Sequence, residues 1–187
     1  MALDEALRRV QAAAATTVLI DGRSGSGKST LAVQLCGSWP DSELVRLDDV
    51  YPGWDGLRWA SEHIRSALLQ PRSKGVPGQW RSWDWTAQRP GSWHSVAPER
   101  RLVVEGMGAL TAASRALADL AIWVEADDAI RKQRALGRDG DTYRPHWDRW
   151  AAQEDEFIDR CHPRRSADLI ATSIGDEFLL TATEGAP

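Results

Sequence analysis

The fold is decided by residues 22–29, which read Gly22-Arg23-Ser24-Gly25-Ser26-Gly27-Lys28-Ser29 and fit the pattern G-x-x-x-x-G-K-[ST] at every position. The glycines let the backbone turn tightly, so that successive N–H groups can point at one polyphosphate. Lys28 can reach the β- and γ-phosphates, and the hydroxyl of Ser29 is placed to ligate Mg²⁺. A helix that starts here directs the positive end of its dipole at the same anion. We therefore predict that residues 22–30, ending at Thr30, bind the phosphates of a nucleotide.

The sequence on either side of this loop supports the prediction. Residues 16–21 form a short β-branched, apolar run, and residues 30–35 have helical character, so the loop joins a strand to a helix. A flexible glycine/serine linker would not be bracketed in this way. A dinucleotide-binding loop of the Rossmann type is disfavoured, because Thr30 stands where that pattern has Gly or Ala.

The rest of the chain repeats the alternation of strand and helix. After residues 16–21, strands are predicted at residues 44–47, 101–106, 120–124 and 167–172, with helices at 3–15, 29–37, 57–70, 111–117, 127–138 and 146–160. Residues 79–95 have little periodicity and are interpreted as a hairpin over the site. The predicted fold is a P-loop NTPase: a three-layer α/β/α domain spanning residues 1–187, with a parallel sheet of about five strands, a core over about 16–173 and a lid over about 131–145.

Composition excludes several classes of protein. The 187 residues carry a net charge of −4, which argues against nucleic acid as the main partner. Cys36 and Cys161 match no metal or disulfide pattern. No targeting segment or apolar run of membrane-spanning length is found, so we expect a cytoplasmic protein without a membrane partner. The chain contains no Asn, and it therefore lacks the N-K-x-D element of guanine-specific P-loop proteins.

Charged residues follow the predicted strands at the edge where a ligand would bind. Asp48 and Asp49 end one strand and Glu105 ends another, and the carboxyl ends of parallel strands face the ligand crevice. Asp48 or Asp49 could take a proton from an acceptor hydroxyl, and Glu105 or Asp48 could support a magnesium ion held by Ser29. An ordinary strand-end carboxylate is the alternative for Glu105.

The predicted helix after residue 126 carries three arginines on one face. Arg131, Arg134 and Arg138 are spaced by three and four residues. They are candidates for a lid that gathers positive charge around a γ-phosphoryl group. The alternative is a solvated helix face.

Aromatic residues are the candidates for binding an acceptor. Tyr51, Trp83 and Trp85 offer flat faces on which a heteroaromatic ring could stack. Asp84 and Asp55 could accept hydrogen bonds from vicinal hydroxyls such as those of a ribose. Alternatively, the tryptophans only pack the segment onto the sheet and Asp84 caps a turn.

Taken in order, these elements resemble the uridine kinase family of P-loop nucleoside kinases. The resemblance covers about residues 16–173 and rests on the loop together with residues 47–51, 83–85, 103–106, 131–139 and 161–168. It implies that Asp48 is the general base, with Tyr51 as the adjacent aromatic, and that Trp83-Asp84-Trp85 meets the nucleoside. It also implies that Glu105 lies by the magnesium ion and that Arg131, Arg134 and Arg138 are lid arginines.

The chain departs from that family at two places. Residues 54–57 replace an acidic segment that follows the base, and Gln88 stands where the family has a His that reads the nucleobase. Gln88 is therefore a candidate for binding the acceptor, and the identity of that acceptor stays open.

We therefore expect an ATP-dependent kinase that uses Mg²⁺ and phosphorylates a hydroxyl of a small molecule, with a nucleoside as the first candidate. A P-loop kinase for a nucleoside monophosphate, a sugar or a vitamin alcohol is the alternative within enzymes. An ATP-binding switch module that is not a kinase is the alternative outside them.

Overall fold

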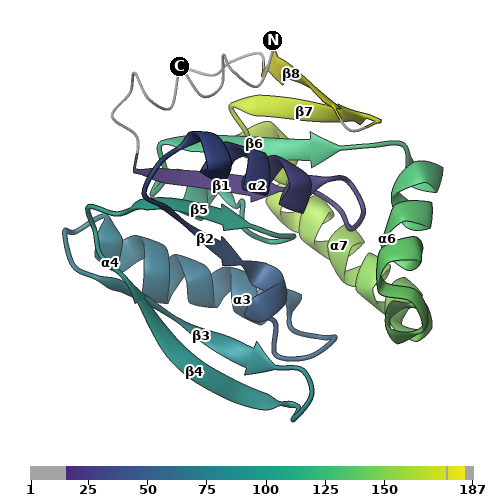
Figure 1. Cartoon of the computed structure of the whole chain (residues 1–187), viewed down its shortest axis with the longest axis horizontal. Helices are drawn as coiled ribbons and strands as arrows, with labels where there is room; N and C mark the ends of the chain where they lie inside the picture. Colours follow the sequence, from purple (N-terminus) through teal and green to yellow (C-terminus); the bar gives the residue numbers. More distant parts are fainter. Residues whose placement is uncertain (1–15, 176, 184–187) are drawn as a thin grey trace.

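The computed structural model describes residues 16–175 and 177–183, and the helix expected at residues 3–15 lies outside them. The centre of the molecule is a six-stranded sheet in the order β2-β5-β1-β6-β7-β8 (Figure 1). Its strands are β1 Thr17–Asp21, β2 Ser42–Arg46, β5 Arg101–Glu105, β6 Leu120–Glu125, β7 Leu169–Ile174 and β8 Glu177–Ala182.

The sheet confirms the five parallel strands and adds a sixth. Strands β2, β5, β1, β6 and β7 pair in parallel, whereas β8 pairs antiparallel with β7 at the edge. Strand β8 was missed because it follows a tight turn at Gly175 and buries only Leu180, so its sequence carries little strand pattern.

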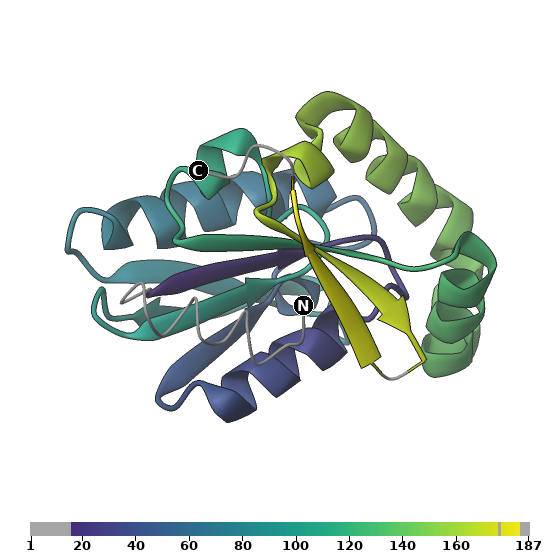
Figure 2. The same ribbon diagram turned by 90° about the horizontal axis from the view of Figure 1, so that it is seen from above.

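Helices cover both faces of the sheet, as the predicted three-layer fold requires. Figure 2 shows α2 on one face and α3, α5, α7 and α8 on the other. The helices are α2 Lys28–Ser38, α3 Leu57–His63, α4 Gln70–Arg72, α5 Ala112–Arg115, α6 Asp128–Tyr143, α7 Trp147–Cys161 and α8 Pro163–Ser166. A π-helical segment, Ile64–Leu69, joins α3 to α4.

Strand β1, which leads into the loop, is buried on both of its faces. Val18 and Ile20 pack in the cluster beneath α2, and Leu19 packs in the cluster on the opposite face. All three side chains are fully buried, as expected for a central parallel strand whose side chains alternate between two covered faces. The loop therefore leaves a strand that cannot shift without disrupting both halves of the core.

The predicted hairpin is confirmed. Strands β3 Gly78–Asp84 and β4 Arg89–Val96 form a separate two-stranded sheet, irregular between Arg81 and Trp83. Helix α6 spans Asp128–Tyr143 but is interrupted inside this range. Gly140 has a non-helical φ of 52° and ψ of −131°, so two helical stretches meet there at a kink, close to residue 138, where the predicted helix ends.

Within residues 16–175 and 177–183, no helix has both the length and the apolar character needed to cross a membrane.

Candidate active site

The loop after β1 adopts the tight, left-handed backbone conformations that its glycines predict. Gly25 and Gly27 have φ 78° and 103°, in the left-handed region. A Cβ on Gly25 would lie 1.9 Å from the backbone oxygen of Arg131, so no larger residue fits there. Helix α2 begins at Lys28, immediately after the loop. The loop is thus wound tightly at the start of a helix and touches α6.

A cavity of about 280 Å³ lies over this loop. It is lined by Gly25, Gly27, Lys28, Ser29, Thr30, Arg134, Ala135 and Arg138. Arg134 is held in place because its guanidinium donates to Ser173 Oγ and to the Gly175 carbonyl, each at 2.9 Å. The buried Ser26 hydroxyl has no hydrogen-bond partner among the described residues, so it could donate to an oxygen of a bound phosphate. The cavity is the candidate site for the phosphates of a nucleotide, and we call it the phosphate cavity.

The residues for a magnesium ion lie beside this cavity. Ser29 Oγ donates to Glu105 Oε1 at 2.9 Å, so the hydroxyl and the carboxylate meet as the sequence predicted. Burial raises the pKa of Glu105, an effect that the charge of Lys28 opposes. No group of three or more His, Cys, Asp or Glu side chains in the described part of the chain could hold a metal. A hydroxyl, a carboxylate and phosphate oxygens are nevertheless hard donors of the kind that Mg²⁺ prefers, and this ion commonly keeps several waters.

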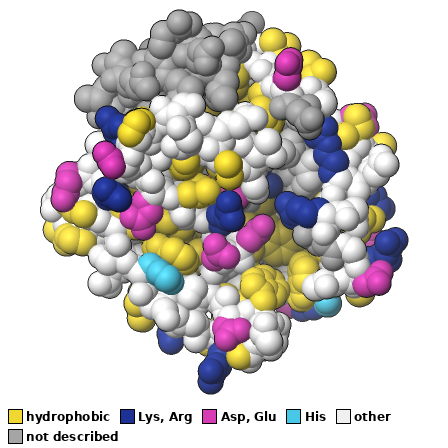
Figure 3. Space-filling model, in the orientation of Figure 1, with side chains coloured by type: hydrophobic (Ala, Val, Ile, Leu, Met, Phe, Trp, Pro, Cys, Tyr) yellow, Lys and Arg dark blue, Asp and Glu magenta, His cyan; other side chains and the backbone are white. Residues whose placement is uncertain are grey.

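A larger cavity of about 600 Å³ opens beside the first, and we call it the aromatic cavity. It is lined by Ser24, Lys28, Asp48, Tyr51, Trp54, Trp85, Gln88, Met107, Arg138, Thr142, Tyr143 and Trp150. Lys28 and Arg138 line both cavities. On the face of the molecule seen in Figure 3, acidic and basic side chains gather near the centre, next to hydrophobic ones. Two different ligands could therefore meet between Lys28 and Arg138.

The aromatic side chains that line the aromatic cavity pack against one another. Trp54 stacks on Tyr143 with centroids 5.4 Å apart and planes at 10°, and its ring lies 5.1 Å from that of Trp85. Trp150 meets Tyr51 edge-on, with centroids 4.7 Å apart. Such contacts give the cavity a defined apolar shape before any ligand binds.

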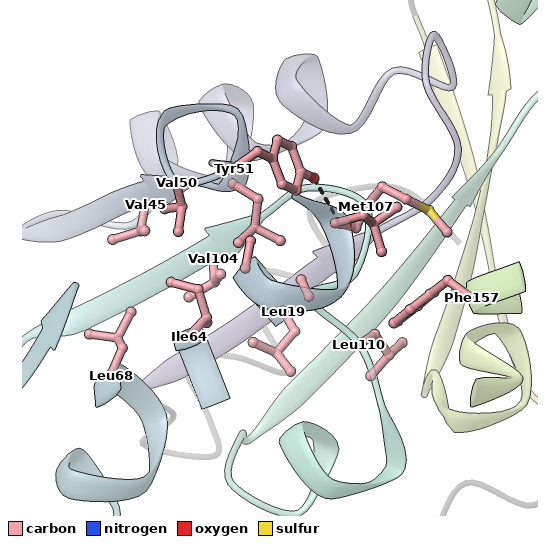
Figure 4. Close-up of a cluster of buried hydrophobic side chains, with 14 of the residues drawn as sticks. Leu19, Val45, Val50, Tyr51, Ile64, Leu68, Val104, Met107, Leu110 and Phe157 are labelled. Atoms are coloured by element: carbon pink, nitrogen blue, oxygen red, sulfur yellow. Dashed lines mark hydrogen bonds between the residues drawn. The ribbon is translucent and has the colours of Figure 1, made fainter. Parts of the chain in front are cut away.

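Two hydrogen bonds anchor the segment that carries Asp48. The hydroxyl of Tyr51 donates to the Met107 carbonyl at 2.7 Å (Figure 4). Trp85 Nε1 donates to the carbonyl of Asp48 at 2.8 Å, which ties the hairpin end to this segment. Asp48 lines the aromatic cavity, whereas Asp49 does not, so Asp48 is the better placed of the two as a base.

The structure places three of the predicted acceptor-binding residues outside the aromatic cavity. Asp84 accepts hydrogen bonds from the N–H groups of Thr86 and Ala87 at 3.0 and 2.9 Å, so it caps the hairpin turn. Asp55 pairs with Arg149 at the surface. These two and Trp83 do not line the aromatic cavity. Local hydrogen-bond partners hold the carboxylates of Asp84 and Asp55 elsewhere. Tyr51 and Gln88 do line it.

The three arginines predicted on one face of α6 also separate. Arg131 is buried, lies 2.5 Å from Asp128 and 3.8 Å from Glu154, and lines neither cavity. Arg134 and Arg138 both line the phosphate cavity. Arg23, the second residue of the loop, directs its guanidinium to Glu154 and Asp155 of α7, so only its backbone stays with the loop.

Sequence reasoning missed much of the aromatic cavity and the buried carboxylate behind it. Trp54, Tyr143, Trp150 and Glu154 come from two distant segments and match no motif. The one available signal was the spacing of Trp150 and Glu154, which are four residues apart and share the buried face of α7.

Comparison with known proteins supports the assignment of the fold. The sequence matches no protein-family model and no curated protein. The structure is similar to that of a possible uridine kinase from Bacillus stearothermophilus, with 18% sequence identity and a TM-score of 0.65 over 90% of this chain and 96% of that one. It is also similar to a proposed fructose transport system kinase from Silicibacter sp. TM1040, with 20% identity and a TM-score of 0.57 over 89% and 95% of the two chains. The protein thus has the fold of P-loop kinases.

Proposed function

We propose that this protein is a kinase that transfers the γ-phosphoryl group of ATP to a hydroxyl of a small acceptor bearing an aromatic ring, with a nucleoside as the first candidate. The observation that carries the proposal is the sharing of Lys28 and Arg138 by the phosphate and aromatic cavities. A donor phosphate in one cavity and an acceptor hydroxyl in the other would meet beside these two cations.

Phosphoryl transfer needs positioning and charge stabilisation more than covalent help from the protein. In this proposal the loop N–H groups hold the phosphates, and Lys28 and Arg138 stabilise the charge that develops on the transferred group. Asp48 accepts the proton of the attacking hydroxyl. Mg²⁺, held by Ser29 with Glu105 beside it, would neutralise charge on the β- and γ-phosphates when bound.

The lining of the aromatic cavity favours an uncharged, flat acceptor. Five aromatic side chains border it, and Asp48 is the one carboxylate among the described lining residues. Its cations, Lys28 and Arg138, are both shared with the phosphate cavity, so none is reserved for a phosphate on the acceptor. A nucleoside monophosphate and a polar sugar therefore fit less well than a nucleoside or an aromatic vitamin alcohol.

The acceptor class is tested by measuring ATP consumption with a panel of nucleosides, nucleoside monophosphates, sugars and vitamin alcohols. We expect stimulation by at least one nucleoside. Stimulation confined to a sugar would refute the aromatic acceptor.

Trp85→Ala should raise the KM for the acceptor that stimulates turnover. Stacking of a base on an aromatic side chain contributes about 1–3 kcal/mol by alanine substitution, which corresponds to about 5- to 150-fold in affinity. Trp83→Ala is the matched control, because Trp83 lies two residues away and does not line the cavity. Steady-state kinetics with varied acceptor provide the measurement. Equal changes in KM for the two variants would contradict the assignment.

Arg134→Ala and Arg138→Ala should lower kcat more than they raise the KM for ATP. This pattern marks an interaction that is made mainly in the transition state. Arg144→Ala is the control, because Arg144 is an exposed arginine close in sequence that lines neither cavity. If the losses appear only in KM, the two arginines anchor the phosphates of the ground state instead.

A further inference from the structure

Glu154 is a buried carboxylate that the proposed reaction does not use. It lies on α7, its side chain is only 1% exposed, and it faces the loop that follows β1. Both views of the ribbon show the loop after β1 running toward α6 and α7 (Figures 1 and 2). A buried charge is costly unless it is well paired, so the partners of Glu154 indicate what it does.

Two of these partners belong to the phosphate-binding loop. Glu154 Oε1 accepts a hydrogen bond from the backbone N–H of Ser24 at 2.8 Å, and Oε2 accepts one from Arg23 Nε at 3.1 Å. Arg131 of α6 adds a third positive or polar group, 3.8 Å from Oε2. The first half of the loop is therefore positioned by α7.

The remaining partner belongs to the aromatic cavity. Trp150 Nε1 donates to Glu154 Oε1 at 3.1 Å, so this single oxygen accepts from both Trp150 and the N–H of Ser24. Trp150 and Ser24 both line the aromatic cavity. Tyr143, another lining residue, donates its hydroxyl proton to Ser24 Oγ at 3.0 Å. A ligand that moves the Trp150 ring would also move the oxygen that holds the loop.

We propose that Glu154 is a positioning residue that couples the aromatic cavity to the phosphate-binding loop, so that the state of Trp150 changes the affinity for ATP. The inference rests on the proposed function, because it takes the two cavities as the acceptor and donor sites. It assigns Glu154 no contact with either substrate. Coupling between two sites is reciprocal, so it can be measured from the ATP side without knowing the acceptor.

The test is titration calorimetry with a non-hydrolysable ATP analogue and Mg²⁺ on the full chain. Trp150→Phe removes the N–H that Glu154 accepts and keeps an aromatic ring. It should weaken binding of the analogue about 5-fold or more, within the usual range of coupling between sites. Trp85→Phe is the matched control: it alters another wall of the same cavity, but its N–H is bonded to Asp48 and not to Glu154. It should leave the affinity for the analogue unchanged.

Glu154→Gln should weaken binding at least as much as Trp150→Phe. It removes the charge that faces Arg23 and Arg131 and keeps the size of the side chain. Melting temperatures are measured alongside, and Trp150→Phe decides the question even if Glu154→Gln does not fold. Binding by Trp150→Phe equal to the parent, or equal weakening in Trp85→Phe, would overturn the coupling. Failure of the parent to bind the analogue would overturn the nucleotide-binding function as well, which distinguishes the two failures.

Discussion

Lys28→Ala should leave a folded protein that has lost nearly all phosphoryl transfer. Lys28 lines both cavities, so its ammonium is available to both of the ligands in the proposed reaction. Removing one donor that stabilises transition-state charge costs on the order of 10²- to 10³-fold in kcat. Turnover and thermal melting should be measured on the same preparation.

Lys74→Ala provides the control, because Lys74 is exposed in the turn after α4. It should retain parental turnover. Turnover of Lys28→Ala within about tenfold of the parent would show that the loop does not carry the role assigned to it, since even one lost charge-stabilising donor exceeds that factor.

Asp48→Asn should lower kcat by about 10²- to 10⁴-fold, the usual contribution of a general base, with little change in ATP binding. The asparagine keeps the shape of the side chain but cannot take a proton. Steady-state kinetics with saturating ATP are the measurement, and calorimetry with the ATP analogue checks that the donor site is intact.

The neighbouring carboxylate is the matched control for this prediction. Asp49→Asn changes the same functional group one residue away, and Asp49 does not line the aromatic cavity. Burial, together with the charge of Asp48, raises the pKa of Asp49. A larger loss in Asp49→Asn than in Asp48→Asn would move the role of base to Asp49.

The parts of the fold that local patterns encode were predictable. A strand buried on both faces is apolar along its whole length, and a glycine-rich loop between a strand and a helix is typical of phosphate binding. The sequence of residues 16–37 therefore predicted β1, the loop and α2. Asp48 and Glu105 could be placed at one edge of the sheet, because parallel strands end on the same side.

The features that the sequence did not predict depend on contacts between segments that are far apart in the chain. The aromatic cavity combines Trp54, the hairpin end at Trp85, and Tyr143 and Trp150 from around the α6–α7 junction. No single stretch of sequence carries that pattern. Asp84 lies outside the aromatic cavity, and its carboxylate accepts hydrogen bonds from two backbone N–H groups of its own turn, a local interaction that competes with any ligand.

Arg131 lines neither cavity for a related reason. Its spacing put it on one face with Arg134 and Arg138, but the first turn of α6 packs against the loop and α7, where Asp128 and Glu154 pair with Arg131. Helical periodicity predicts which residues share a face, and it does not say which part of that face is covered by another helix.

The most direct test of the kinase proposal follows the γ-phosphoryl group itself. ATP labelled in its γ-phosphate with radioactive phosphorus is incubated with the protein, Mg²⁺ and the acceptor panel, and the products are separated by chromatography. We predict that label appears in a phosphorylated nucleoside, with one ADP formed for each label transferred, and that Lys28→Ala abolishes the transfer. Label released only as inorganic phosphate, at a rate that no acceptor changes, would contradict the proposal and indicate an ATP-hydrolysing switch.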